Sequence, residues 1–290
     1  MKIKNVTILD TFAEAWTLEV VRVVLTAISS EVALGGAYQF AGAAGSSMIG
    51  SRINAGIERL ALPQETPDGR PGVYVSMAMP PDQRENMLKE IELRIALASL
   101  IPTIAVFDAA VEGVPGETVK IHDKFNVSAE RWQGYDSERE LDGRKLCVLP
   151  TTTGEFIYEK SYKVCINGTD GHFVCFADSE VAAVTAVAAA KAALEAVDGA
   201  APMGYGLEQV FREYDYIPAL RDKIEDSKVP DGVSSILNLL MFGASPEIMK
   251  RAMAVSLQAA AQVPGVLYLG AMNFGGAFGK HQYHLHELLK

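Results

Sequence analysis

The sequence predicts an α+β protein built from two lobes, each with the element order βαββαβ. The chain has 290 residues, more than one small domain usually holds, and 49% of them are hydrophobic, enough for a substantial core. Apolar and amphipathic segments also follow the same order twice along the chain. We therefore expect one lobe at residues 1–145 and a second at residues 146–290.

The first pass starts with a β-branched, apolar segment of the kind that forms buried strands. A helix follows, with Ser30 as its expected N-cap. Two strands then flank a turn rich in proline and glycine. In the next helix Met87, Ile91 and Ile95 share one apolar side, and Arg94 lies off it. The expected segments are Val20–Ile28, Glu31–Ala43, Ser47–Leu60, Val73–Met79, Asp82–Leu100 and Thr103–Phe107.

The second pass follows a polar stretch at residues 112–144 that we expect to be mostly loop. Ser179 and Ser245 are the expected N-caps of its two helices, and an irregular strand follows the first of them. The expected segments are Phe173–Phe176, Ser179–Val197, Val233–Phe242, Pro246–Gln262 and Val266–Met272. Two such passes predict two ferredoxin-like lobes packed together.

Charge and cysteine content restrict the function classes. A net charge of −10 argues against nucleic-acid binding, which needs clustered Lys and Arg. Cys147, Cys165 and Cys175 form no CxxC pair, so we expect reduced thiols that pack in the core, the last two flanking an Asn-Gly turn. The chain has no secretion signal and no long uncharged apolar run, which predicts a cytoplasmic protein outside the membrane.

Two loops carry candidate binding residues. The turn at residues 65–72 holds Asp68 and Arg70, and the guanidinium of Arg70 could grip an anionic group. We favour the simpler interpretation that this pair stiffens the turn. The loop Asn273–Gly279 contains Gly275 and Gly276, which would let a ligand approach the backbone; a glycine-bent strand end is an equally good interpretation.

Asn238 interrupts the apolar strand Ile236–Leu240. A buried amide needs hydrogen-bond partners, so it is either a structural amide or a donor directed into a cleft. The histidines near the C-terminus lack the spacing of a metal site, and the chain has no nucleophile elbow, phosphate loop or dinucleotide motif. We therefore predict no metal and no cofactor.

Several motifs occur together in a characteristic order. They are Asp10–Ala15 (DTFAEA), Glu65–Val73 (ETPDGRPGV), Leu141–Lys145 (LDGRK), Gly154–Phe156, Asn273–Gly276 (NFGG) and His284–Leu288 (HLHEL). This set resembles the formylmethanofuran:tetrahydromethanopterin formyltransferase family, including the homologous subunit of the bacterial formyltransferase/hydrolase complex. The resemblance runs from about Val6 to the C-terminus.

The resemblance implies two ferredoxin-like lobes and a homo-oligomer, a tetramer or dimer, that could belong to a larger complex. It also implies transfer of a formyl group from methanofuran to tetrahydromethanopterin, both of them substrates, through a tetrahedral intermediate. No metal or redox cofactor is required. The binding residues we expect are Asp68, Arg70, Arg221, Asp222, Asn273, Gly275 and Gly276.

The chain departs from the family in its second half. Asn238 aligns with a glutamate that the family is thought to use as a protonated acid, and an amide can donate a hydrogen bond but cannot deliver a proton. Leu220–Lys223 replaces a Ser-Thr-Asn-Asp signature. Two hypotheses follow: a divergent formyltransferase with Asn238 as the catalytic donor, or an inactive paralogue that binds a C1 carrier or serves as a scaffold. An open cleft at Asn238 would favour the first; burial of Asn238, or a cleft filled by Phe211 and Tyr214, would favour the second.

Overall fold

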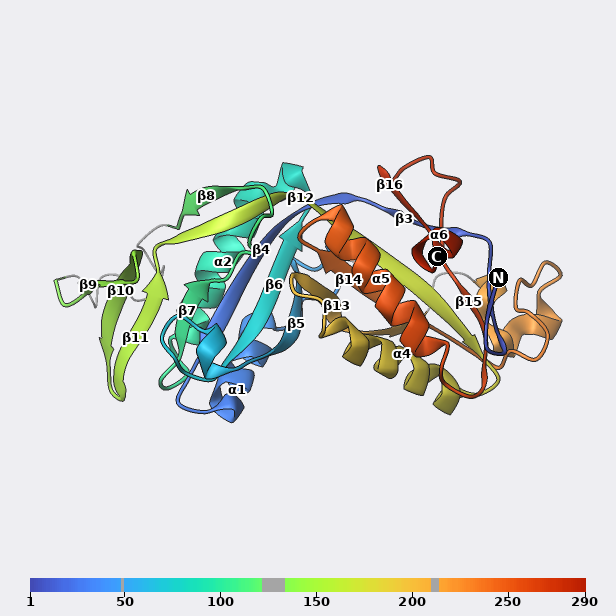
Figure 1. Ribbon diagram of the computed structural model, residues 1–290, viewed down its shortest axis with the longest axis horizontal. Helices are drawn as coiled ribbons and strands as arrows, with labels where there is room; N and C mark the ends of the chain where they lie inside the picture. The colour runs from blue at the N-terminus through green and yellow to red at the C-terminus, as the bar shows by residue number, and fades with distance from the viewer. Residues whose placement is uncertain (48–49, 122–133, 210–213) are drawn as a thin grey trace. The chain divides into compact units, whose positions relative to one another are not determined.

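The computed structural model describes residues 1–47, 50–121, 134–209 and 214–290 (Figure 1). The chain divides into two compact units. The middle unit is Leu18–Gly168, and the terminal unit joins Met1–Thr17 to Thr169–Lys290. The boundary expected between residues 145 and 146 lies inside strand β10 (Arg144–Thr151), which belongs to the middle unit.

The middle unit contains a complete βαββαβ pass. Its elements are β4 (Thr17–Thr26), α1 (Ser30–Ala41), β5 (Asn54–Ala61), β6 (Gly72–Met79), α2 (Arg84–Ala98) and β7 (Ala105–Asp108). The antiparallel strands are ordered β5-β6-β4-β7, the ferredoxin-like order. A core of aliphatic side chains lies between this sheet and the two helices.

Further strands extend this unit. They are β8 (Gly116–Lys120), β9 (Ser137–Leu141), β10, β11 (Gly154–Glu159) and the first part of β12 (Ser161–Ala177). Two of them, β8 and β9, lie in the stretch at residues 112–144 where the sequence predicted loop. β9, β10 and β11 form successive antiparallel pairs, and β11 adds to β7 in parallel. The prediction of loop was wrong for β8 and β9 because their side chains are largely exposed and polar, which hides the strand pattern.

The terminal unit repeats the same order. Its elements are the end of β12, α4 (Glu180–Leu194), β13 (Ala200–Gln209), β14 (Ser235–Gly243), α5 (Pro246–Ala260) and β15 (Val266–Gly270). The strand order is β13-β14-β12-β15, all antiparallel, and α4 and α5 lie side by side on one face (Figure 1). Both lobes are therefore ferredoxin-like, which confirms the predicted fold class.

Short elements complete the terminal unit. β1 (Lys2–Ile3) and β2 (Val6–Ile8) form a hairpin, and β2 runs parallel to β15. β3 (Phe12–Ala15) pairs with β16 (His281–His284), which leads into α6 (Leu285–Leu288). Two 3-10 turns, η4 (Tyr214–Tyr216) and η5 (Pro218–Lys223), precede β14.

Three local predictions were wrong. Ser29 caps α1, because its extended backbone places Oγ 3.3 Å from the Val32 amide; the expected cap, Ser30, is already helical. The strand expected from Ser47 begins at Asn54, whose Oδ1 accepts the Ser47 amide. Arg94 is buried, because its guanidinium donates to the Phe40 and Ala41 carbonyls at the end of α1.

All three cysteines are free and buried, as expected for core residues. The expected Asn-Gly turn between Cys165 and Cys175 is absent, because β12 continues through both residues. Within the described residues no helix is long and apolar enough to cross a membrane.

Candidate functional site

The candidate site lies on the face of the terminal sheet opposite α4 and α5. Cross-strand pairing places Glu208 of β13, Asn238 of β14, Val174 of β12 and Gly270 of β15 in one row across the sheet. Directly opposed residues in an antiparallel pair project from the same face, with Cβ atoms about 4.5–5.5 Å apart. The row therefore brings a carboxyl group beside the amide that sequence analysis singled out.

Asn238 is 4% exposed, and its Oδ1 atom has no hydrogen-bond partner among the described residues. Such an atom costs free energy unless a donor reaches it. Glu208 is only partly buried, and burial raises the pKa of its carboxyl group. Among the described residues it makes no ion pair. In this row a buried hydrogen-bond acceptor, Asn238 Oδ1, thus lies next to the more exposed carboxyl group of Glu208.

Two more polar residues of β12 lie on this face, two and four positions before Val174. His172 accepts the Met272 amide on Nε2 at 3.0 Å, and burial lowers its pKa to about 4, so the ring is neutral. Burial raises the pKa of Asp170 to about 7, against the opposing effect of the Trp16 amide 2.6 Å from Oδ1. This face therefore carries two acids and a neutral imidazole, and among the described residues neither acid forms an ion pair.

The glycine-rich loop that follows β15 is organised by Glu14 of β3. Burial opposes ionisation of this carboxylate, but it accepts the amides of Phe274, Gly276, Phe278 and Gly279 at 2.6–3.0 Å, and the pKa falls to about 2. A charged Glu14 thus replaces the anion that such a ring of amides would otherwise attract. This contact explains why the Asp10–Ala15 and Asn273–Gly276 motifs occur together.

The predicted binding residues of this loop support its shape. Asn273 Nδ2 donates to Thr11 Oγ1 and to the Phe12 carbonyl, while Oδ1 accepts the Gly275 amide. Gly275 and Gly276 have φ near +72° and +77°, which favours glycine. A Cβ on Gly276 would also meet the Gln282 side chain, whereas the space beside Gly275 is open. Only Gly275 therefore leaves its backbone accessible on that side.

Arg221 and Asp222 lie on η5. Arg221 donates from one nitrogen to the Pro230 and Val233 carbonyls at 2.6 and 2.7 Å, so it secures the segment that leads into β14. Asp222 is exposed. Of the side chains named above as possible fillings of a cleft, Tyr214 is 70% exposed and Phe211 lies outside the described residues.

Asp68 and Arg70 lie in the middle unit and bind each other. Arg70 Nε donates to Asp68 at 2.8 Å, and its other nitrogens reach Thr26 Oγ1 and the Thr103 carbonyl. Asp68 in turn accepts the Thr26 hydroxyl at 2.7 Å. The pair stiffens the turn and fixes it to the end of β4, in agreement with the simpler interpretation of these residues.

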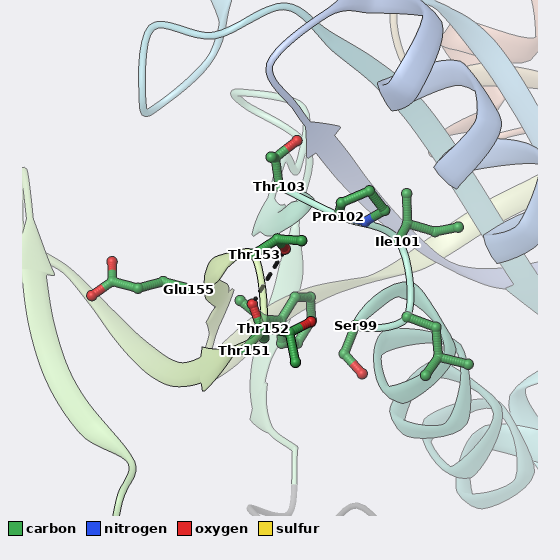
Figure 2. Close-up of a pocket in the computed structure, with 10 residues that line it drawn as sticks. Ser99, Ile101, Pro102, Thr103, Thr151, Thr152, Thr153 and Glu155 are labelled. Atoms are coloured by element: carbon green, nitrogen blue, oxygen red, sulfur yellow. Dashed lines mark hydrogen bonds between the residues drawn. The ribbon is translucent and has the colours of Figure 1, made fainter.

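The middle unit also has a small cavity of about 180 Å³. Figure 2 shows it between the segment after α2, with Ser99, Pro102 and Thr103, and the β10–β11 turn at Thr151–Thr153. None of the predicted site residues lines it. In the part of the chain that the structure describes, no group of three or more His, Cys, Asp and Glu side chains could hold a metal ion.

The sequence did not predict the placement of Glu208, Asp170 and His172 on this face, nor the role of Glu14. Glu208 and Asn238 are thirty positions apart, so only the register of β13 against β14 places them together. For Glu14 a signal existed, because its motif and the glycine-rich motif occur in one characteristic set, but the set alone does not give the contact.

Comparisons with known proteins agree with this architecture. A family model described as "Formylmethanofuran-tetrahydromethanopterin formyltransferase" matches residues 1–151, and one described as "FTR, proximal lobe" matches residues 211–288. The formylmethanofuran–tetrahydromethanopterin formyltransferases of Methanopyrus kandleri and Methanosarcina barkeri are each 35% identical over 99% of this chain and 100% of their own length.

Solved structures give the same result. The formyltransferase from Methanosarcina barkeri superposes with a TM-score of 0.87 at 34% identity, over 99% of this chain and 100% of that one. A chain of the formyltransferase/hydrolase complex from Methylorubrum extorquens, solved with methylofuran, superposes with a TM-score of 0.80 at 26% identity, over 100% of this chain and 99% of that one. This chain therefore belongs to the formylmethanofuran–tetrahydromethanopterin formyltransferase family.

Proposed function

We propose that this protein transfers a formyl group between the amine of a methanofuran-type carrier and the amine of a tetrahydromethanopterin-type carrier. One observation carries the proposal: relatives named for this reaction match the chain from end to end. The match covers both lobes of the chain.

The terminal sheet face supplies groups suited to this chemistry. The attacking amine converts the formyl carbon to a tetrahedral centre whose oxygen gains negative charge, which a positioned N–H can stabilise. Asn238 has such a donor in Nδ2, and we propose it as the catalytic donor. Its burial, at 4% exposed, is the one observation that favours the alternative of an inactive paralogue. The reaction also needs two carriers held in register, which positioned binding residues provide.

The proposed binding residues are Asn273, Gly275 and Gly276 in the glycine-rich loop, Arg221 and Asp222 on η5, and Asp68 and Arg70 in the middle unit. Arg70 donates from three nitrogens and Arg221 from one to groups within the chain, so their main contribution would be to shape the loops that contact the carriers. The open space beside Gly275 supports backbone contact there.

We propose further that the chain self-associates and that it can take part in a larger assembly. The structural neighbour from Methylorubrum extorquens is part of a multi-subunit complex, which supports the second statement. Light scattering of the purified protein tests self-association directly. A monomer at micromolar concentration would contradict it.

The function is tested by incubating the purified protein with formylmethanofuran and tetrahydromethanopterin and following the formylated pterin. A family transferase serves as the positive control. We expect turnover well above the uncatalysed rate. Absence of turnover while the control is active would overturn the proposal, and titration with each carrier would then distinguish an inactive carrier-binding paralogue from a scaffold subunit.

A further inference from the structure

Glu208 is a carboxyl group with no assigned structural role. It projects from β13 on the sheet face opposite α4 and α5, directly across from Asn238. Among the described residues no cation pairs with it, and it is part-exposed, whereas the neighbouring Asn238 is 4% exposed. A carboxyl group that is neither paired nor fully solvated is available for proton transfer.

Asn238 provides the second observation. Its Oδ1 is buried and has no donor among the described residues. A formamide made from a primary amine keeps one N–H, and that N–H is a suitable donor for this oxygen. A formamide bound in this way would place its nitrogen beside the row formed by Asn238 and Glu208.

From this arrangement we propose that Glu208 is the general acid of the transfer and that Asn238 Oδ1 accepts the N–H of the formamide. The inference rests on the proposed function and identifies a catalytic residue for it. The direction of the pKa shift of Glu208 agrees with this role, because burial raises the pKa and so favours the protonated form of the carboxyl group.

The step balances as follows. The acceptor amine forms a bond to the formyl carbon, and the carbonyl π electrons move to the oxygen. When the tetrahedral centre collapses, the bond from that carbon to the donor nitrogen breaks, and its electron pair goes to the nitrogen. The Glu208 carboxyl group gives its proton to that nitrogen. The resulting carboxylate then takes the proton that the acceptor nitrogen loses, which restores the acid.

The first test is Glu208→Gln, which keeps the size of the side chain but removes the proton. General acid catalysis contributes about 10²- to 10⁴-fold, so we expect kcat to fall at least about 100-fold with KM changed only a few-fold. Gln209→Glu is the matched control, because the adjacent residue of a strand projects to the other face. This control should retain wild-type activity.

The second test is rescue. In Glu208→Asp a carboxyl group stays in the same row on a side chain that is shorter by one methylene, and kcat should exceed that of Glu208→Gln at least about tenfold. The double variant Glu208→Gln/Gln209→Glu should not recover. A purely structural role of Glu208 would not give this pattern, and circular dichroism with the melting temperature identifies a variant that fails to fold.

The outcomes separate the two proposals. An inactive wild-type protein overturns the proposed function and this inference with it. An active wild-type protein whose Glu208→Gln variant keeps its kcat overturns the inference alone and leaves formyl transfer in place.

Discussion

The two ferredoxin-like units carry different polar side chains on the sheet face opposite their helices. In the middle unit the face opposite the helices carries Arg22 of β4, Ser76 of β6 and Glu58 of β5. Arg22 Nε donates to Glu58 at 2.9 Å, and the Ser76 hydroxyl donates to its other oxygen at 2.5 Å. All three residues are buried, and each has a partner.

In the terminal unit the corresponding strands β12, β14 and β13 carry Val174, Asn238 and Glu208. No cation lies in this row among the described residues, so the glutamate has no ion pair there and the amide oxygen has no donor. In the middle unit the polar groups of this face satisfy one another through a buried ion pair, so their role is structural. The terminal face keeps polar groups whose hydrogen bonds a ligand could complete.

The strongest test of this contrast is Arg22→Leu in the middle unit. Removal of the cation leaves Glu58 buried without its charged partner, and breaking such a pair typically costs about 3–5 kcal/mol. We expect a loss of that size in the free energy of unfolding, measured by urea denaturation.

The control for this prediction is the double variant Arg22→Leu/Glu58→Leu, which removes both charges. Replacement of a buried pair by apolar side chains is often neutral, so the double variant should regain most of the lost stability. A single variant that loses less than about 1 kcal/mol would mean that the ion pair does not hold this face together.

Glu14 extends this comparison, because among the described residues its carboxylate is stabilised by hydrogen bonds from backbone amides and not by an ion pair with a cation. Its pKa falls from 4.5 to about 2 on folding, so the unfolded chain binds more protons between these values. The charge therefore stabilises the fold above pH 4.5, and this stabilisation disappears as the pH falls toward 2. Wild type should exceed Glu14→Gln in stability at pH 6 by an amount smaller than the Arg22 effect.

The measurement is the difference in melting temperature between wild type and Glu14→Gln across the pH range. Common titrations such as that of His172 cancel in this difference. It should be largest above pH 5 and should narrow below pH 4. A constant difference over the whole range would show that the ionised carboxylate does not hold the loop.

The sequence predicted the ferredoxin-like passes because their buried strands and capped helices give strong local signals. Ser179 and Ser245 cap α4 and α5 as expected, since their side chains accept amides three residues ahead. β8 and β9 gave no such signal, because exposed strands lack alternation between apolar and polar residues. Arg94 was misplaced because carbonyls from another helix make burial of its charge possible.

The candidate site was only partly predictable. Asn238 could be found because a polar residue stands out in an apolar strand, whereas Glu208 lies in an irregular strand and acquires meaning only through pairing with β14. The catalytic role of Glu208 and the roles of the predicted binding residues stay predictions until activity is measured. Arg70 and Arg221 illustrate the general difficulty. A sequence gives the charge of an arginine, but it does not show which carbonyl groups accept hydrogen bonds from its guanidinium.

The last prediction concerns Asp170, a buried acid on the sheet face opposite the helices whose carboxyl group accepts the Trp16 amide. Its pKa rises on folding from 3.8 to about 7, so between these values the folded state binds more protons than the unfolded state. Stability therefore falls as the pH rises through this window. Asp170→Asn keeps an oxygen for the Trp16 amide and removes the charge. It should be more stable than wild type at pH 8 and no more stable at pH 4, as measured by urea unfolding. A stabilisation equal at both pH values would mean that the gain does not come from the charge, and the terminal face would then tolerate an ionised acid as well as the middle face does.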